Sequence, residues 1–572
     1  MLTSHPCEQH STDHQRRLDQ GWQVASKRPN LRSGFTLGGE QAEADALLEA
    51  AFYESSDYKV IESREDRRCF VVGRTGSGKS AALQRLEEVH PDHVIRISPE
   101  DLSLPYITNL HAIRYLDSLE INLDTFWTTL WKHVLLVEII RHRYKVNNPA
   151  AKQSFLSTIR DRISNDQAKR AALEYLDEYE GRFWCEADER VREITDNFTR
   201  KFDLDVGLNA GGGPAAVKFG ASRGGEESTQ TKAQQVDRFQ RIVNDTQLAR
   251  LNKMMTVLDE DVLDSSQHYT YVVIDDLDRD WVDERIANDL IRCLFRTVLD
   301  LKRVQNLKVL VALRSNIFQE LDFGRRGGGQ EEKFRALVLQ MRWTRFDLEG
   351  LLNQRVHIAG ERVGLTAHTI TELLPNANNA MGKPLDYLLD RTLLRPRDAI
   401  AFANECLGLG IGKPKLAWVD IKNAEQPYSE KRLMALRDEW KETYPGIDKA
   451  FSAFRRSPAR MSKQELTTRL DEIMLLPSTP TFEGVRWMTN VTSSMWASGP
   501  DDSWFDLYQP VLRLLFVVGF LGCEGDRSKV PVFFQDNPLF VDHESNIERA
   551  DAFFVHRTYH AGLDIRAAGE RP

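Results

Sequence analysis

The chain alternates between short, mainly apolar runs and longer stretches in which apolar residues recur with a helical period. The short runs lie at 69–72, 93–97, 271–274 and 308–313. Runs of this length, rich in β-branched residues, are typical of strands that are buried on both faces of a parallel sheet. The pattern therefore predicts an α/β fold with a parallel sheet at its core.

Helical periods occupy much of the remaining chain. They are clearest at 123–144, 398–407 and 429–443. Residues 40–56 also carry such a period, through Ala44, Leu47, Leu48, Ala51 and Phe52, and predict a helix that leads into the first strand. Beyond residue 503, apolar helices and short strands alternate as far as about residue 565.

The spacing of the strands predicts a large insertion and several domains. The run at 271 begins about 190 residues after Lys79, and the chain between them is mostly helical by pattern. The predicted organisation is a flexible tail (1–33), a core that holds the strands (34–110 and 266–375), a mainly helical insertion (111–265), a helical region (376–476) and a C-terminal domain (477–572). Within the insertion, the glycine-rich segment 202–225 alternates apolar and polar residues, and it fits either a hairpin or a flexible loop.

One segment carries a specific chemical signal. Residues 73–80 read GRTGSGKS and fit the pattern G-x-x-x-x-G-K-[ST] of the P-loop, with a predicted strand before it and a predicted helix after it. Such a loop surrounds phosphates with backbone N–H groups, adds a lysine charge, and offers a hydroxyl to Mg²⁺. We expect ATP to contact Gly73, Arg74, Thr75, Gly76, Ser77, Gly78, Lys79, Ser80 and Ala81. No N-K-x-D segment that would favour GTP follows.

Carboxylates follow the third apolar run, in the arrangement of a Walker B strand. The sequence from 272 to 279 is VVIDDLDR. A buried parallel strand delivers such acids to the carboxyl edge of the sheet, where ligands bind. We expect Asp275 to hold Mg²⁺ together with Ser80, and Asp276 to orient or deprotonate water, with Asp278 as the alternative for that role.

Three arginines are further candidates. Arg314 ends the fourth apolar run, where it would reach a γ-phosphate and stabilise the developing charge. The alternative is a strand-end arginine paired with a surface acid. Arg395 and Arg397 flank Pro396 at the start of a predicted helix. Either can reach the nucleotide from a lid, and either can instead form a structural salt bridge.

Composition limits the partners and the compartment. Net charge is −9, which argues against a wholly electrostatic nucleic-acid coat but leaves a local basic face possible. The six cysteines are scattered, without a C-x-x-C pair, and the first residues have no apolar signal segment. The most apolar stretch, 512–521, is too short to span a bilayer. We expect a cytoplasmic protein without a membrane partner.

The motifs together resemble the additional-strand P-loop ATPases of the KAP and STAND groups, which are related to AAA+ proteins. The matching segments are AEADALLEAAF before the P-loop, GRTGSGKS, IDDLDR, the tryptophan of DRDW, LRSNIF, LLRPRD, EWKETYP and FFVHRTYHAGL. The resemblance implies an ATPase core, a helical lid and a C-terminal winged helix. It places Arg314 at a sensor 1 position and Arg395 or Arg397 at a sensor 2 position. Many KAP proteins carry transmembrane helices, and this chain shows none.

Three functions follow as hypotheses. The first is an ATPase used as a nucleotide-driven switch or assembly module in bacterial antiphage defence or stress, with a homo-oligomer or a separate effector protein as partner. The second is a DNA-associated motor or loader, for which the basic stretch with Lys431, Arg432, Arg437, Arg455, Arg456 and Arg460 would contact phosphates. The same stretch also fits a solvated helical face. The third is a nucleotide-binding scaffold that recruits an effector.

Overall fold

The computed structural model describes residues 30–98, 123–145, 149–163, 172, 248–277, 284–321, 334–377, 380–497, 499, 503–525 and 530–565. The chain divides into two compact units. The sheet unit comprises Gly38–Leu351 and Thr392–Ala401, and the helical unit comprises Met1–Leu37, Leu352–Arg391 and Phe402–Pro572. The segment 202–225, Asp278 and most of the predicted tail lie outside the described residues.

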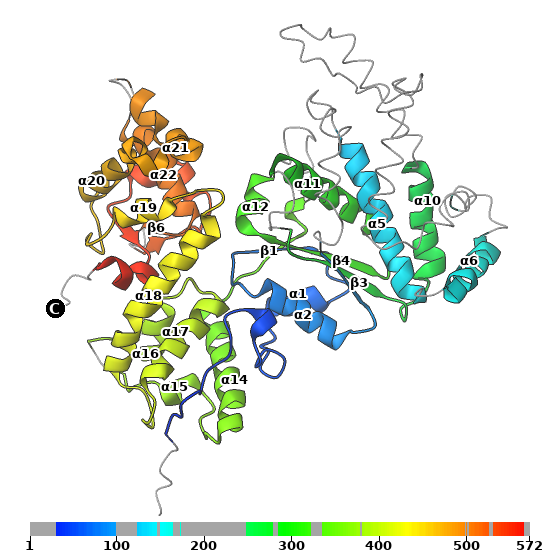
Figure 1. Cartoon of the computed structure of the whole chain (residues 1–572), viewed down its shortest axis with the longest axis horizontal. Coiled ribbons are helices and arrows are strands. Elements are labelled where there is room, and N and C mark those ends of the chain that lie inside the picture. Colours follow the sequence, from blue (N-terminus) through cyan, green and yellow to red (C-terminus); the bar gives the residue numbers. More distant parts are fainter. Residues whose placement is uncertain are drawn as a thin grey trace, which may run out of the picture. The chain divides into compact units, whose positions relative to one another are not determined.

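A parallel sheet forms the centre of the sheet unit (Figure 1). Its five described strands are β1 (Phe70–Gly73), β2 (Val94–Ile97), β3 (Thr270–Ile274), β4 (Leu307–Arg314) and β5 (Val338–Gln340). Their order is β2-β3-β4-β1-β5, and every neighbouring pair is parallel. The four apolar runs correspond to β1 to β4, so the predicted parallel α/β core is confirmed. The three residues of β5 are too few to give a pattern.

Alternate strand residues are buried on opposite faces of the sheet. Val71, Val273 and Leu310 pack with α1 (Ser56–Glu62) and α2 (Lys79–Val89) on one face. Phe70, Val272 and Val311 pack on the other face with helices that include α5 (Asp124–Tyr144), α10 (Leu248–Val257) and α11 (Glu284–Leu301). The strands are therefore mainly apolar because helices cover both faces.

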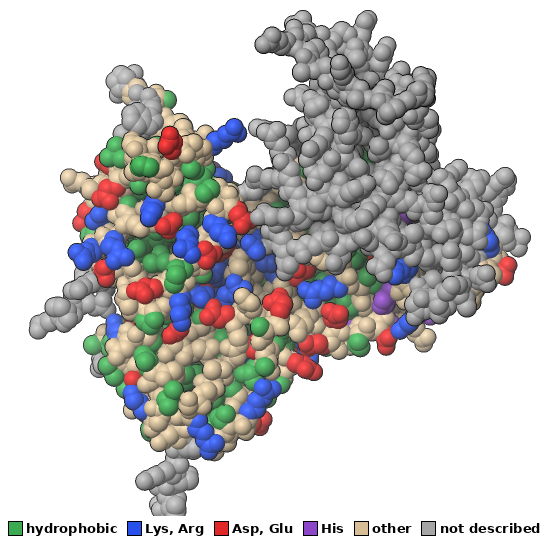
Figure 2. Space-filling model, viewed as in Figure 1, with side chains coloured by type: hydrophobic (Ala, Val, Ile, Leu, Met, Phe, Trp, Pro, Cys, Tyr) green, Lys and Arg blue, Asp and Glu red, His purple; other side chains and the backbone are tan. Residues whose placement is uncertain are grey.

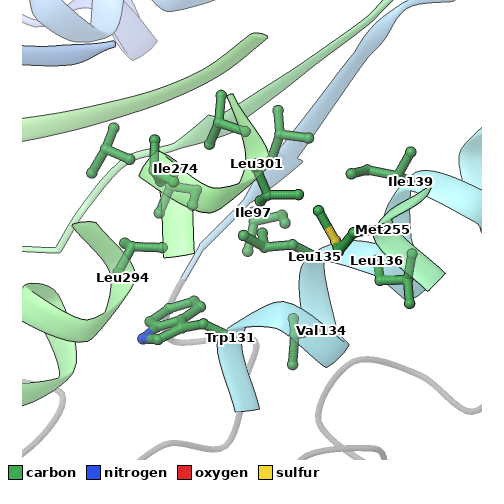
Figure 3. Packing of buried hydrophobic residues seen from close by; sticks show 14 of the residues in the cluster. Ile97, Trp131, Val134, Leu135, Leu136, Ile139, Met255, Ile274, Leu294 and Leu301 are labelled. Atoms are coloured by element: carbon green, nitrogen blue, oxygen red, sulfur yellow. The ribbon is translucent and has the colours of Figure 1, made fainter. Parts of the chain in front are cut away.

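The second face contains the larger core, to which the predicted insertion contributes α5 and α10. Figure 3 shows Trp131, Leu135 and Ile139 of α5 pointing toward residues of the strands and of α11. The indole Nε1 of Trp131 donates a hydrogen bond to the Leu290 carbonyl at 3.0 Å, so the polar end of this buried ring is satisfied. The remaining described helices of this unit are α6 (Pro149–Ile163) and α12 (Ser315–Glu320).

The prediction of a helix over residues 40–56 is wrong. Only a 3-10 turn at Ala42–Ala44 forms there, followed by turns, and the helix begins at Ser56. The Asp45 carboxylate accepts hydrogen bonds from the backbone N–H groups of Gly39 (2.9 Å) and Leu47 (3.1 Å). Such local bonds offer the backbone an alternative to helix, while Leu47 and Leu48 are still buried.

The helical unit contains most of the later elements. Its helices are α14 (Arg345–Val363) and α17 (Pro396–Leu409), which both begin in the sheet unit, then α15 (Ile370–Leu373), α16 (Pro384–Leu389), α18 (Trp418–Trp440), α19 (Ile447–Ser452), α20 (Lys463–Met474), α21 (Arg486–Ala497), α22 (Trp504–Val517) and α23 (Glu544–Glu548). The predicted helices at 123–144, 398–407 and 429–443 correspond to α5, α17 and the C-terminal half of α18.

A small antiparallel sheet lies at the end of this unit. Strand β6 (Leu521–Glu524) pairs with β7 (Pro531–Val532) and with β8 (Phe553–Val555). The Phe520 ring lies beside Phe451, Phe454 and Tyr559, with ring centroids 4.6, 5.2 and 5.5 Å away. This aromatic cluster ties the sheet to α19 and to the last described segment. No helix among the described residues of either unit has the length and apolarity to cross a membrane.

Candidate functional site

The segment 74–78 forms a tight bend between β1 and α2. Gly76 and Gly78 have φ of 78° and 91°, in the left-handed region that glycine adopts at little cost. Helix α2 begins at Lys79, so the backbone N–H groups of its first turn lie at the bend. The predicted strand, loop and helix therefore follow one another in the order that the motif requires.

The Lys79 side chain folds back over this bend. Its Nζ donates hydrogen bonds to the carbonyl oxygens of Gly73 at 2.7 Å and of Arg74 at 3.3 Å. The ammonium group is thus held beside the loop backbone. A phosphate placed at the helix N-terminus would offer it a stronger, charge-assisted partner.

Two hydroxyls of the bend are buried without a partner. Neither Thr75 Oγ1 nor Ser77 Oγ makes a hydrogen bond within the described structure. The Ser77 side chain lies so close to Gly73 that a Cβ on that glycine would be 2.5 Å from its Oγ. A buried hydroxyl without a partner is costly, so these atoms fit a polar ligand at the bend. Ser80 follows Lys79 in the first turn of α2 and is half-buried.

The acidic pair follows β3 at the same edge of the sheet. Asp275 is only 6% exposed, and its Oδ1 accepts a hydrogen bond from the Asp276 N–H at 3.0 Å. Its Oδ2 lies 3.5 Å from a guanidinium nitrogen of Arg96 on β2. Asp276 has φ of 60°, a left-handed conformation that aspartate tolerates better than most residues. Arg96 carries no motif, so the sequence did not point to it.

Strand β4 places Arg314 beside the bend. Gly73 at the end of β1 is paired in register with Arg314, while Ile274 of β3 is paired with Val311. The ends of β1, β3 and β4 therefore meet at one edge. Ser315, the next residue, is 8% exposed, and its Oγ makes no hydrogen bond within the described residues.

The segment at the start of α17 contacts the bend directly. Arg395 Nη1 donates to the Thr75 carbonyl at 2.9 Å, while its Nε and Nη2 donate to the Asp398 carboxylate at 2.7 and 3.1 Å. Arg395 therefore forms the structural salt bridge that was its alternative role, with the fully buried Asp398. The same side chain also holds the loop through the Thr75 carbonyl.

Arg397 uses its backbone and its side chain in different ways. Its N–H donates to the Gly76 carbonyl at 3.4 Å, and its Nε donates to the Glu40 carbonyl at 3.1 Å. Its side chain passes along Gly76, where an added Cβ would lie 2.9 Å from Arg397 Cβ. Both predicted arginines of this segment therefore contact the bend or the chain beside it.

Sequence reasoning missed Trp343, which follows β5. Its indole Nε1 donates to the Ser77 carbonyl at 2.8 Å, and its ring lies 6.1 Å from the Tyr53 ring. Burial, with the nearby Asp347 carboxylate, raises the pKa of Tyr53 above its ordinary value. No local pattern marks this tryptophan, because its contact with the bend comes from the pairing of β5 with β1.

The described basic residues of the later stretch are largely paired. Lys431 contacts Glu405, Arg437 contacts Asp438, and Arg460 contacts Glu524. Arg455 and Arg456 both lie near Asp564, at 3.0 and 3.9 Å. Over the described chain, no group of three or more histidine, cysteine and acidic side chains is arranged to hold a metal.

The chain is similar to known proteins in two ways. A model of the FunZ-associated C-terminal helical domain matches residues 346–437, the stretch from α14 to most of α18. Over 560 residues, the chain is also 21% identical to the "Putative transposon gamma-delta 80.3 kDa protein" of Escherichia coli, an alignment that covers 92% of this chain and 67% of that protein. The similarity thus includes a helical domain and, at low identity, most of the chain.

Proposed function

We propose that this chain is a Mg²⁺-dependent ATPase that acts as a nucleotide-driven switch or assembly module. The observation that carries the proposal is the bend between β1 and α2, which bears Lys79 and lies at the sheet edge where β3 delivers Asp275 and Asp276. An anion cradle beside a pair of carboxylates is the arrangement that nucleotide hydrolysis needs.

The residues present fit ATP and Mg²⁺. The buried hydroxyls of Thr75 and Ser77 lack partners that a polar ligand would supply. Ser80 and Asp275 are the proposed metal ligands, and Mg²⁺ when bound would neutralise charge on the phosphates. Lys79 would exchange its carbonyl partners for phosphate oxygens, and Asp276 would orient water.

Arginines provide the proposed response to the γ-phosphate. Arg314 ends β4 next to Gly73 and is the proposed sensor. Arg395 is tied to Asp398 and to the Thr75 carbonyl, so we assign it a positioning role for the loop. Arg397 remains the candidate for a lid contact with nucleotide, since its backbone and side chain line Gly76.

The strand order supports the resemblance to additional-strand ATPases. Strand β4 lies between β1, which carries the loop, and β3, which carries the acids. On that resemblance to the KAP and STAND groups, we propose a role in bacterial antiphage defence or stress, with a homo-oligomer or a separate effector as partner. The winged-helix assignment of 477–572 belongs to the same proposal.

A DNA-associated motor or loader is the second candidate. One observation favours it, namely the name of the Escherichia coli relative, which refers to a transposon. The charges on the face drawn in Figure 2 argue against a broad DNA-binding surface there. Figure 2 shows Lys and Arg side chains interspersed with Asp and Glu in that view, and the later basic residues lie near acids.

The test is steady-state ATP hydrolysis with and without double-stranded DNA. The variants are Lys79→Ala and Asp276→Asn, because asparagine keeps the left-handed backbone of Asp276 accessible. Lys449→Ala, an exposed lysine of the helical unit, is the control. We expect the control to match the original chain, and both site variants to lose at least a hundredfold in turnover, with no effect of DNA.

Other outcomes separate the candidates. Strong stimulation by DNA would favour the motor or loader. ATP that binds tightly but is not hydrolysed by the original chain would favour a scaffold that recruits an effector. Absence of ATP binding would remove all three functions.

A further inference from the structure

A second concave region lies at the opposite edge of the sheet. Its volume is about 430 Å³, and its walls come from the segment that enters β1 and from the turn between α11 and β4. Cys69 and Leu307, at the amino ends of these neighbouring strands, line it. The strands run from this edge to the candidate site, which for the eight residues of β4 means roughly 25 Å.

Positive charge dominates this region, here called the basic cavity. Its cationic lining residues are Arg64, Arg67, Arg68, Lys302, Arg303 and Lys308, and its acidic ones are Glu65 and Asp66. The ion pair described among them is Arg68 with Asp66 at 2.7 Å. Six cationic and two acidic residues thus line the region, an excess of four formal positive charges.

Two lysines of the basic cavity are held by carbonyl groups. Lys302 Nζ donates to the Arg67 carbonyl at 2.8 Å, and Lys308 Nζ donates to the carbonyls of Val60 and Ser63. Carbonyl oxygens orient an ammonium group without cancelling its charge. Burial lowers the pKa of Lys308 to about 8 and also lowers that of Lys302, and neighbouring cations act in the same direction.

We propose that the basic cavity binds a small anion with several negative charges, such as a phosphate-bearing metabolite. A volume of this size is ordinary for a small-molecule site. Guanidinium groups match the geometry of phosphate oxygens, and lysine adds a point charge. The sugar-phosphate backbone of a nucleic acid would contact the exposed Arg64 and Arg67. It would not reach Lys308, which is 6% exposed. This site is separate from the proposed ATP site and does not depend on it.

The experiment is calorimetric titration with inorganic pyrophosphate at low salt. The full chain carrying Lys79→Ala is the starting protein, because this change weakens phosphate binding at the bend between β1 and α2. To it we add Arg67→Gln with Lys302→Gln, which removes two charges from the basic cavity. Lys441→Gln with Lys449→Gln, two exposed lysines elsewhere, removes the same charge as a control.

We expect saturable binding in the Lys79→Ala chain, a loss of at least tenfold in affinity with the cavity pair, and less than a twofold change with the control pair. Arg303→Gln, a change at an exposed residue, should weaken binding severalfold and serves if the cavity pair does not fold. No saturable binding in the Lys79→Ala chain, or equal affinity in cavity and control variants, would overturn the proposal.

Discussion

Gly76 and Gly78 share a left-handed backbone, yet their surroundings differ. A Cβ at Gly78 would find its nearest neighbour, Trp343, at 3.6 Å, whereas a Cβ at Gly76 would meet Arg397 at 2.9 Å. The motif requires glycine at position 78 but leaves position 76 open. Only the structure explains why Gly76 cannot be enlarged without moving the segment at the start of α17.

Gly76→Ala should therefore weaken nucleotide binding at least tenfold. The left-handed backbone costs alanine about 1–2 kcal/mol, and the clash displaces Arg397 as well. Gly364→Ala is the matched control, since Gly364 has φ of 71° and nothing within 4 Å. It should lower the melting temperature without changing the Kd for an ATP analogue. Equal Kd values for the two variants would contradict this account of Gly76.

Lys308 predicts a specific dependence of stability on pH. Its pKa falls from 10.5 to about 8 on folding, so between these values the unfolded chain binds more protons and stability rises with pH. The full cost of the buried charge is present below about pH 8 and disappears above about pH 10.5.

From pH 7.5 to 9.5, this group should add about 2 kcal/mol to the free energy of unfolding. Lys308→Met should lack that rise, whatever its baseline stability, while tyrosine titrations affect both proteins alike. Urea unfolding at both pH values measures the difference. Parallel pH profiles would show that Lys308 remains charged in the folded chain.

Among the elements, α5 and α11 are joined by charge as well as by apolar packing. Asp124 at the start of α5 is 8% exposed, and its carboxylate accepts from Arg292 and Arg296 of α11. Arg292 is itself buried. Removal of the Asp124 carboxylate would leave the buried guanidinium of Arg292 with less negative charge beside it.

Asp124→Ala should lower the stability of the sheet unit by about 3 kcal/mol. Asp92→Ala is the control, because the Asp92–Lys145 pair is exposed and such pairs contribute little to stability. Thermal unfolding followed by tryptophan fluorescence compares them. A similar small shift in both variants would mean that solvent reaches Arg292 when its partner is lost.

The sequence predicts those elements whose signal is local. Strands β1 to β4 are mainly apolar runs because helices cover both faces, and the sequence itself shows this pattern. The prediction of a helix over 40–56 failed because the Asp45 carboxylate accepts hydrogen bonds from nearby backbone N–H groups instead. Trp343 and Arg96 were missed because only the pairing of distant strands brings them to the candidate site.

At the scale of the whole molecule, charge is negative and mixed. Net charge is −9, and the basic residues of the later stretch lie near acids. Nonspecific DNA affinity depends on phosphate contacts by unpaired cations and falls steeply with salt when these are many. The second candidate function needs such a set of contacts.

We expect weak binding of double-stranded DNA at physiological salt and a shallow salt dependence, equivalent to fewer than about three phosphate contacts. Arg455→Gln with Arg456→Gln should change the affinity less than twofold. Fluorescence anisotropy across a range of salt concentrations gives both quantities. A steep slope that this pair of changes reduces would place DNA on the helical unit.

The hydrogen bond from Arg395 to the Thr75 carbonyl joins residues that are 320 positions apart. A ribosome adds 5–20 residues per second, so roughly 16 to 64 seconds pass between the synthesis of the loop and the synthesis of Arg395, which holds it. During that interval β1 and α2 can form, but the loop lacks the contacts of Arg395 and Arg397. If the loop binds nucleotide as we propose, binding is therefore a late event in the synthesis of each chain, and a chain that stops before Arg395 lacks the contact.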